Sequence, residues 1–443
     1  MKLYSENDSY KIYNGDILDM LQVIKPESID AIVCDPPYEL GFMNKSWDST
    51  GIAFKKETWK NCFEVLKPGG YLLAFGGSRT YHRIACAIED AGFEIRDCVM
   101  YLYGTGFPKS CNIGLAIDKK NGIGNRTGNI RADGVNNQNI CYDFKAMKPK
   151  FEERIAQNEW QGWGTCLKPA YEPIIVARKP FKGSVVNNII KYRVGGINID
   201  GCKIGNEKRT QFSGKSNGRI YSEYSQKNAH FETVEGRFPA NVITDGSEEV
   251  AKGMPNTTST PRTPTTGGTG GIGKVTNFQR GSETSNFNDS GSAMRYFYSA
   301  KASKKDRDEG LDAFQDKTFH SVLNPKNGSG DRLDGAKTPI RKNIHPTCKP
   351  TELMQYLVRL VSPKGATILD PFMGSGSTGK AVMFENRERD ANYKFIGIEL
   401  TDEYLPIAQA RIEYARDKFK YDLEQEKVTK GKQNIFDFME SEE

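Results

Sequence analysis

Two short apolar runs, one near each end of the chain, most constrain its fold. Residues 29–34 (IDAIVC) run directly into Asp35-Pro36-Pro37-Tyr38, and residues 366–369 (ATIL) run into a second polar, glycine-rich motif over 370–377 (DPFMGSGS). Each run has the length and composition of a buried strand and ends in turn-forming residues. In open parallel sheets, ligands bind beyond the carboxyl ends of the strands. The two motifs are therefore expected to form two halves of one crevice.

Strand-like and helix-like patterns alternate around both motifs. Strands are expected over 10–14, 71–75, 93–102 and 395–398, helices near 55–66, 78–91 and 351–361, and a turn over 67–70. This alternation predicts an α/β fold, with a doubly wound, mostly parallel sheet and helices on both faces. The apolar segments 172–178 and 237–245 are expected to pack against that sheet.

The two motifs, in this order, resemble the signature of DNA amino-methyltransferases of the β group, which use S-adenosyl-L-methionine. The resemblance covers residues 10–110 and 340–415. It implies the Rossmann-like methyltransferase fold in a permuted form, with the catalytic motif before the cofactor motif and a large DNA-recognition region inserted between them. It also implies S-adenosyl-L-methionine as the methyl donor and double-stranded DNA as the substrate. A homodimer and a cognate restriction endonuclease are further partners to consider.

The first motif offers the groups that activate an exocyclic amine of adenine or cytosine. Such an amine is a poor nucleophile because its lone pair is delocalised into the ring. The Asp35 carboxylate and the Pro36 carbonyl can accept its two N–H groups and draw the nitrogen toward a tetrahedral shape. Pro36 and Pro37 fix the backbone, and the Tyr38 ring can stack on an extruded base. We predict these four residues as catalytic; a proline turn capped by an acidic residue is the purely structural alternative.

The second motif is suited to hold a small cofactor. Gly374 and Gly376 allow close approach of the backbone and positive φ, and Ser377 and Thr378 are expected to cap the helix that follows. No lysine of a phosphate-binding loop follows, which favours a cofactor without such a phosphate. A carboxylate at Glu399, at the end of the next strand, can hold ribose hydroxyls.

The resemblance assigns further cofactor contacts. It implies Asp370 at the methionyl end, Phe372 at the adenine, and Thr347 and Lys349 at the methionine carboxylate. Asp16 is either an adenine contact or a helix cap. We predict no metal site, and the full set of predicted cofactor-binding residues is Asp16, Thr347, Lys349, Asp370, Phe372, Gly374, Ser375, Gly376 and Glu399.

Positive charge is concentrated between the two motifs. Residues 121–345 contain 34 Lys and Arg against 23 Asp and Glu, a net charge of +11, whereas the rest of the chain has a net charge of −5. Lysines and arginines that neutralise phosphates gain affinity for DNA through counterion release, although a generic basic surface is the alternative. The stretch 253–292 is rich in Gly, Ser, Thr and Asn and is predicted to be flexible. Its Gly268 to Gly273 segment matches a dinucleotide fingerprint but follows no strand.

These observations divide the chain into four regions. They are a catalytic half over 1–120, an inserted target-recognition region over 121–340, a cofactor-binding half over 341–420 and a charged tail over 421–443. Nine cysteines without a Cys-x-x-Cys pair favour a reducing cytoplasm. No apolar run is long enough to cross a membrane, so no membrane partner is expected.

The function expected from the sequence is site-specific methylation of adenine N6 in duplex DNA, with the target base flipped out. In the resembling family, Asp rather than Ser at the first motif position favours adenine. Methylation of cytosine N4 is the main alternative. Methylation of RNA or of a protein glutamine, and a DNA-binding module without activity, are the others. The absence of a Pro-Cys pair argues against methylation at cytosine C5, which needs a cysteine nucleophile.

Overall fold

The computed structural model describes residues 1–40, 46–104, 106, 110–123, 155–213, 230–258, 290–300, 303–318 and 340–417. The chain forms two compact units, of which the first comprises Met1–Gly104 with Tyr171–Glu443 and the second comprises Thr105–Ala170. The charged tail over 421–443 lies outside the described residues.

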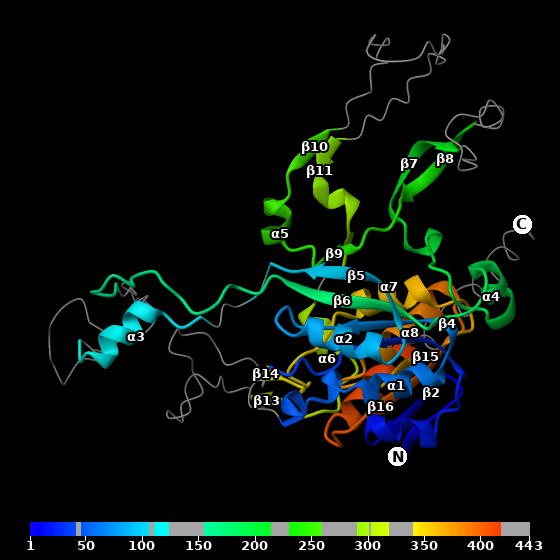
Figure 1. Ribbon diagram of the computed structural model, residues 1–443, viewed down its shortest axis with the longest axis horizontal. Coiled ribbons are helices and arrows are strands. Elements are labelled where there is room, and N and C mark those ends of the chain that lie inside the picture. The colour runs from blue at the N-terminus through cyan, green and yellow to red at the C-terminus, as the bar shows by residue number, and fades with distance from the viewer. Residues whose placement is uncertain are drawn as a thin grey trace, which may run out of the picture. The chain divides into compact units, whose positions relative to one another are not determined.

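A ten-stranded sheet forms the centre of the first unit (Figure 1). Its strands lie in the order β1-β2-β16-β15-β3-β4-β6-β5-β9-β12, and all run in one direction except β1 and β6. The predicted mostly parallel sheet is therefore confirmed. The strand bounds are β1 Lys2–Glu6, β2 Tyr10–Asn14, β3 Ile29–Cys34, β4 Leu66–Phe75, β5 Glu94–Leu102, β6 Tyr171–Arg178, β9 Val242–Thr244, β12 Tyr298–Ser299, β15 Thr367–Asp370 and β16 Lys394–Glu399.

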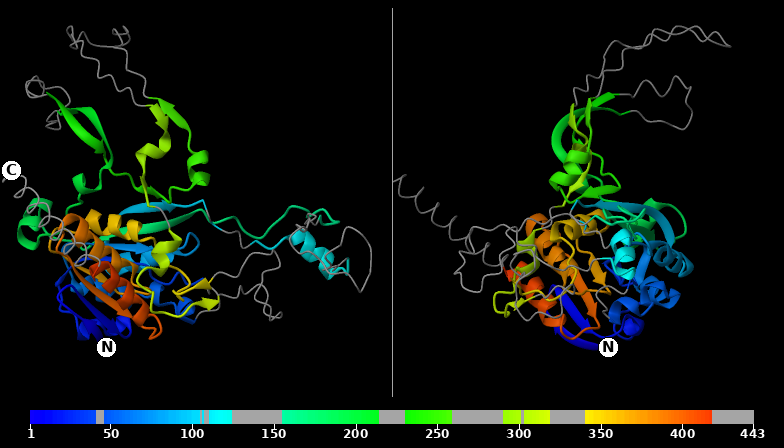
Figure 2. Two further views of the ribbon diagram at one scale, coloured as in Figure 1. Left: turned by 180° about the vertical axis from the view of Figure 1, so that it is seen from behind. Right: turned by 90° about the vertical axis from the view of Figure 1, so that its left-hand side faces the viewer.

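Helices cover both faces of this sheet. Successive side chains of a strand point to opposite faces, so the apolar residues of each strand pack against helices on both sides. On β3, Ala31 and Val33 belong to one apolar core with α7, α8 and a helix over 405–417. Ile32 and Cys34 belong to a second core with η1, α1 and α2. The right-hand view in Figure 2 shows the orange helices of the first core on one side of the sheet and the blue helices of the second on the other. The bounds are η1 Ile17–Gln22, α1 Lys56–Val65, α2 Tyr81–Asp90, α7 Thr351–Val361 and α8 Ser377–Arg389.

The remaining elements of the first unit are short helices and two-stranded ribbons. The helices are η3 Ser46–Ser49, η4 Ile52–Phe54, α4 Val185–Tyr192, η5 Asp200–Cys202, α5 Glu248–Gly253, η7 Ala293–Tyr296 and α6 Lys304–Asp308. The ribbons pair β7 Ile204–Ser213 with β8 His230–Arg237, β10 Asn256–Thr258 with β11 Ser290–Ser292, and β13 Lys317–Thr318 with β14 Ile340–Arg341.

The region predicted as an insertion contributes strands to the sheet. β6, β9 and β12 all fall between residues 121 and 340, and β6 lies between β4 and β5. This confirms that the apolar segments 172–178 and 237–245 pack with the sheet. Residues of the predicted insertion therefore form part of the sheet at several positions, instead of being attached to it at one.

Two local expectations differ from the structure. The segment 67–70 is not a free turn but a bulge inside β4, where the pairing shifts from Ile29 with Leu66 to Ala31 with Tyr71. The bulge is held because Gly69 N–H donates to the Lys179 carbonyl and Lys179 N–H donates to the Gly70 carbonyl. The ends of the stretch 253–292, predicted as flexible, are ordered as the β10–β11 ribbon. Residues 259–289, with the Gly268 to Gly273 segment, lie outside the described residues.

The second unit is built around α3 Ile113–Lys120. Asp118 on this helix is buried and accepts hydrogen bonds from Gln157 N and Asn158 Nδ2, at 2.8 and 2.6 Å. Trp160 and Trp163 meet edge to face with their ring centroids 5.2 Å apart. The Asp118 hydrogen bonds join the segment 110–123 to the segment that begins at residue 155, and the tryptophan pair packs within the latter.

None of the helices in the described part of the chain is both long and apolar enough to span a membrane.

Candidate functional site

The two motifs meet at one edge of the sheet. β3 and β15 are parallel neighbours, with Ile32 paired to Leu369, so that Asp35 and Asp370 both lie at the carboxyl ends of their strands. The Thr378 hydroxyl also donates to the Val33 carbonyl at 3.4 Å. The expectation that the two motifs, distant in the sequence, adjoin at the carboxyl edge of the sheet is therefore confirmed.

Asp35 lies in a cluster of charged and aromatic side chains. Its Oδ2 accepts a hydrogen bond from Lys349 Nζ at 2.6 Å. The same ammonium is 3.3 Å from Glu172 Oε2, and that oxygen accepts a hydrogen bond from the Tyr38 hydroxyl at 3.2 Å. Asp35 Oδ1 is buried and has no hydrogen-bond partner among the described residues. It is therefore an acceptor in this cluster that no described donor satisfies.

The burial of the cluster alters its ionisation. Burial by itself lowers the pKa of Lys349, but the Asp35 and Glu172 carboxylates outweigh it and raise that pKa above its usual value. The pKa of Tyr38 is raised by burial first and then by the same two carboxylates. Lys349 is consequently held as an ammonium and Tyr38 as a neutral phenol near pH 7.

The second motif forms a tight loop between β15 and α8. Gly374 and Gly376 have φ values of +53° and +75°, which a residue with a side chain adopts only at a cost. A Cβ atom at Gly374 would lie 2.9 Å from His345 Nε2. The Arg411 guanidinium holds the loop in place, since its Nη1 donates to the Ser375 carbonyl and hydroxyl at 2.6 and 3.0 Å.

The predicted caps of α8 are wrong. Gly376 is the N-cap residue and provides no side-chain cap. The Ser377 hydroxyl instead accepts from Arg411 Nη1 at 3.2 Å, and the Thr378 hydroxyl donates to Asp370 Oδ2 at 2.5 Å. Because both hydroxyls have buried charged partners within reach, they bond to these instead of the first amides of the helix.

Asp370 is a buried carboxyl group with a perturbed pKa. Its Oδ1 accepts from Phe372 N at 3.1 Å, and its side chain is enclosed by the loop. Burial raises the pKa of Asp370 to about 7, against the opposing effects of the bonds from Thr378 and Phe372. The group therefore titrates near neutral pH in the ligand-free protein.

The carboxylates predicted at the next two strands lie at the ends of neighbouring strands, β16 and β2. Glu399 Oε2 accepts from Gly374 N at 2.8 Å and Oε1 accepts from Thr401 N at 2.7 Å, and burial raises its pKa. Gly15 N donates to the Glu399 carbonyl, which brings Asp16 next to this position. Asp16 Oδ1 accepts from Leu18 N at 2.9 Å, so it acts as a helix cap, the second of its two predicted roles.

The other residues predicted to contact the cofactor differ in their burial and in their observed partners. Phe372 packs against Trp59, with ring centroids 6.1 Å apart. Thr347 is exposed, and its carbonyl contacts His345 Nδ1. Lys349 was predicted to meet a carboxylate of the cofactor, but in the structure its charge is already shared by Asp35 and Glu172. The structure therefore links Lys349 to the first motif instead.

Sequence reasoning missed three residues of the site, namely Glu172, Asp306 and Arg411. Glu172 reaches the cluster because β6 is antiparallel, so the start of β6 lies at the edge where the parallel strands end. A carboxylate at the start of an apolar strand was visible in the sequence, but the direction of the strand was not. Arg411 is fully buried and Asp306 is partly buried, and the partners of both come from distant segments.

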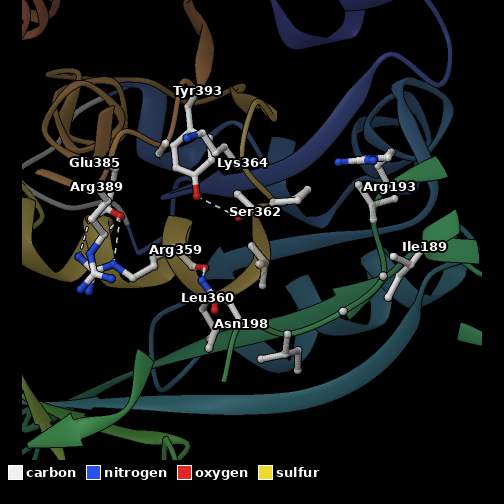
Figure 3. A pocket seen from close by; sticks show the side chains of 17 residues that line it. Ile189, Arg193, Asn198, Arg359, Leu360, Ser362, Lys364, Glu385, Arg389 and Tyr393 are labelled. Carbon is white, nitrogen blue, oxygen red and sulfur yellow. Dashed lines mark hydrogen bonds and ion pairs between the residues drawn. The ribbon is translucent and has the colours of Figure 1, made fainter. Parts of the chain in front are cut away.

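A separate pocket of about 410 Å³ lies away from both motifs (Figure 3). It lies beside the segments that lead into β15 and β16, at their amino ends, with α4 and residues 193–198 on the opposite side. Within it, Arg359 makes two hydrogen bonds to the buried Glu385, and Tyr393 donates to the Ser362 carbonyl at 2.9 Å. None of the predicted site residues lines this pocket.

Comparisons with known proteins identify relatives of this chain. The chain is similar to the type II methyltransferase M.HindIII of Haemophilus influenzae, with 24% identity over 229 residues, covering 42% of this chain and 64% of that protein. It is also similar to the DNA adenine methyltransferase YhdJ of Escherichia coli, with 38% identity over 71 residues, 16% of this chain and 22% of the relative. The matched regions thus span less than two thirds of either relative.

A solved structure and a family model extend the comparison. The PvuII DNA methyltransferase, described as cytosine-N4-specific, aligns over 95% of this chain and 94% of its own at 13% identity, with a TM-score of 0.42. The model of the DNA methylase family N6_N4_Mtase matches residues 29–410, which is most of the chain. The protein therefore belongs to the N6_N4_Mtase family of DNA methylases.

Proposed function

We propose that the protein is a site-specific DNA methyltransferase that transfers a methyl group from S-adenosyl-L-methionine to N6 of an adenine flipped out of duplex DNA. Family membership and the similarity to YhdJ support this reading. The observation that carries it is the buried Oδ1 of Asp35, which has no hydrogen-bond partner in the described part of the chain. An unpaired buried acceptor is costly, and a donor on a ligand removes that cost.

An exocyclic amine suits this acceptor. Its N–H group donates to Asp35 Oδ1, which directs the nitrogen lone pair away from the ring. When bound, S-adenosyl-L-methionine supplies an electrophilic methyl group on a sulfonium sulfur. The nitrogen lone pair forms the new C–N bond, the electron pair of the C–S bond passes to sulfur, and the nitrogen then releases one proton to solvent. The Asp35 carboxylate stabilises the positive charge that develops on the nitrogen.

The loop around Gly374 and Gly376 fits the cofactor. Backbone in the left-handed region without side chains leaves space for a close ligand, and the neighbouring Glu399 carboxylate retains free lone pairs toward ribose hydroxyls. Asp370, Phe372 and Ser375 border the same loop. These residues are therefore proposed as the cofactor site, while Thr347 and Lys349 have weaker support from their observed contacts.

The cofactor proposal is tested at Gly374. Gly374→Ala is expected to lower the affinity for S-adenosyl-L-methionine about tenfold or more, because left-handed strain of about 1–2 kcal/mol adds to a clash with His345. Gly365→Ala is the matched control, since Gly365 has a φ of +81° and no atom within 4 Å of its missing Cβ. The control should lose stability to backbone strain and bind normally in calorimetric titration. Equal affinity of the two variants for S-adenosyl-L-methionine would mean that the cofactor does not bind at this loop.

The target base is tested by product analysis. Duplex DNA methylated in vitro is digested to nucleosides, and N6-methyladenine and N4-methylcytosine are separated by mass spectrometry. We expect N6-methyladenine only. N4-methylcytosine would establish the alternative represented by the PvuII enzyme. No methylated base on DNA, with transfer to RNA or protein, would refute the DNA reading.

The DNA-binding role of the basic region over 121–345, together with a homodimer and a cognate endonuclease, remains a prediction from sequence.

A further inference from the structure

Glu172 contacts two other side chains of the Asp35 cluster, those of Tyr38 and Lys349. One of its oxygens, Oε2, accepts a hydrogen bond from Tyr38 and lies 3.3 Å from Lys349 Nζ. Its side chain is only about a quarter exposed, and that of Lys349 is 10% exposed. The Lys349 ammonium also lies over the rings of Tyr38 and Phe75, at 5.2 and 4.8 Å. A single oxygen atom thus holds both the stacking ring and the cation that contacts Asp35.

The charge of the cluster depends on Glu172. Two carboxylates and one ammonium give a net charge of −1, whereas Asp35 and Lys349 alone form a neutral pair. A neutral pair stabilises a positive charge on the target nitrogen less than a carboxylate whose cation is shared with a second carboxylate. Glu172 therefore has a chemical effect at Asp35 Oδ1 without contacting the substrate itself.

We propose that Glu172 is a positioning residue of the methyl-transfer site, which shares the charge of Lys349 with Asp35 and fixes the Tyr38 ring. The inference rests on the proposed function and assigns a role to a residue outside both motifs. The substrate class is the same, an exocyclic amine that becomes positively charged during transfer.

The test separates the charge of Glu172 from its shape. Glu172→Gln keeps an oxygen that can accept from Tyr38 but removes the negative charge. We expect its single-turnover methylation rate to fall about tenfold or more near pH 7, which corresponds to about 1.4 kcal/mol, with the affinity for S-adenosyl-L-methionine unchanged. Glu172→Asp keeps the charge and should retain a larger part of the rate.

The split between rate and affinity distinguishes this role from a structural one. Lys349 contacts Asp35, Glu172 and Tyr38, and Asp35 still raises the pKa of its ammonium when Glu172 is neutral, so the cation stays in place. A role in charge and positioning lowers the single-turnover rate at saturating DNA and S-adenosyl-L-methionine and leaves the reaction amplitude unchanged. A loss of folded protein lowers the amplitude instead.

Glu94→Gln is the matched control. Glu94 pairs with Arg178 at the opposite end of β6, at 2.7 Å, and its loss removes an ion pair from the same two strands. It should show the wild-type rate and amplitude, with thermal melts confirming that each variant is folded. A Glu172→Gln rate equal to wild type, a loss of amplitude without a loss of rate, or a Glu172→Asp rate as low as that of Glu172→Gln would overturn the inference. A wild-type chain that methylates no DNA would instead refute the proposed function.

Discussion

Asp35→Asn is expected to lower the rate of methyl transfer about 10²- to 10³-fold while leaving the affinity for S-adenosyl-L-methionine within about twofold. The substitution keeps the shape of the side chain and removes the charge that the amine nitrogen requires as it becomes positive. Because that charge appears only as the C–N bond forms, binding of the cofactor is affected little. Single-turnover methylation and calorimetric titration measure the two effects separately.

Asp30→Asn provides a comparison on the same strand. Asp30 pairs with Lys67 at 2.6 Å and accepts from Thr367 N at 2.8 Å, so its loss weakens the strand without changing the site. The folded fraction of the Asp30→Asn variant should transfer methyl groups at the wild-type rate. Normal turnover by Asp35→Asn would show that the Asp35 carboxylate takes no part in methyl transfer.

The largest effect on stability is expected at Asp306. Its carboxylate accepts from Lys380 Nζ at 2.6 Å and from both the backbone and the hydroxyl of Thr351, and it lies 3.8 Å from Arg411. The Lys380 and Arg411 side chains are fully buried. Asp306→Ala leaves this positive charge short of a partner, and we expect the free energy of unfolding to fall by about 3–5 kcal/mol. Urea denaturation would show the change as a lower midpoint.

The pH dependence of unfolding identifies the same group. Although burial by itself raises the pKa of Asp306, the charge of Lys380 and the hydrogen bonds from Lys380 and Thr351 outweigh it and lower that pKa. The stabilisation is therefore fully present above the unfolded-state pKa of about 3.9 and is lost as the pH falls through the lower folded-state value. The variant should lack this acid-dependent loss. Asp390→Asn is a surface control, since Asp390 is 88% exposed where it pairs with Lys364 and Asn tolerates its φ of +50°, and it should cost less than about 1 kcal/mol. Equal losses in the two variants would contradict the assignment.

The parts of the fold that the sequence predicts are those set by local pattern. The helix Thr351–Val361 has the predicted bounds because its apolar residues recur at helical spacing and proline precedes it. The two motifs were placed at strand ends because a continuous apolar run followed by Gly and Pro is a local signal. The positive φ of Gly374 and Gly376 follows from the same kind of reasoning.

The parts that the sequence does not predict depend on which segments meet in the folded chain. Glu172 joins the site only because β6 enters the sheet against the direction of its neighbours. Lys349 has the residue type expected for an anion, but the anion it meets in the structure is Asp35. Ser377 and Thr378 have cap-forming side chains, yet buried Arg411 and Asp370 are their partners. In each case a long-range contact outweighs a local preference.

The antiparallel pairing of β5 with β6 has a consequence for how the chain tolerates changes in length. Leu102 and Tyr171 are paired residues in the ladder, so the chain leaves the sheet and returns to it at neighbouring positions. The sheet therefore fixes the two ends of the intervening segment, whatever its length. Doubling the length of a flexible segment with fixed ends costs only about 0.6 kcal/mol in closure entropy. We therefore expect insertions or deletions between residues 103 and 170 to leave Asp35, Glu172 and the loop at Gly374 in place.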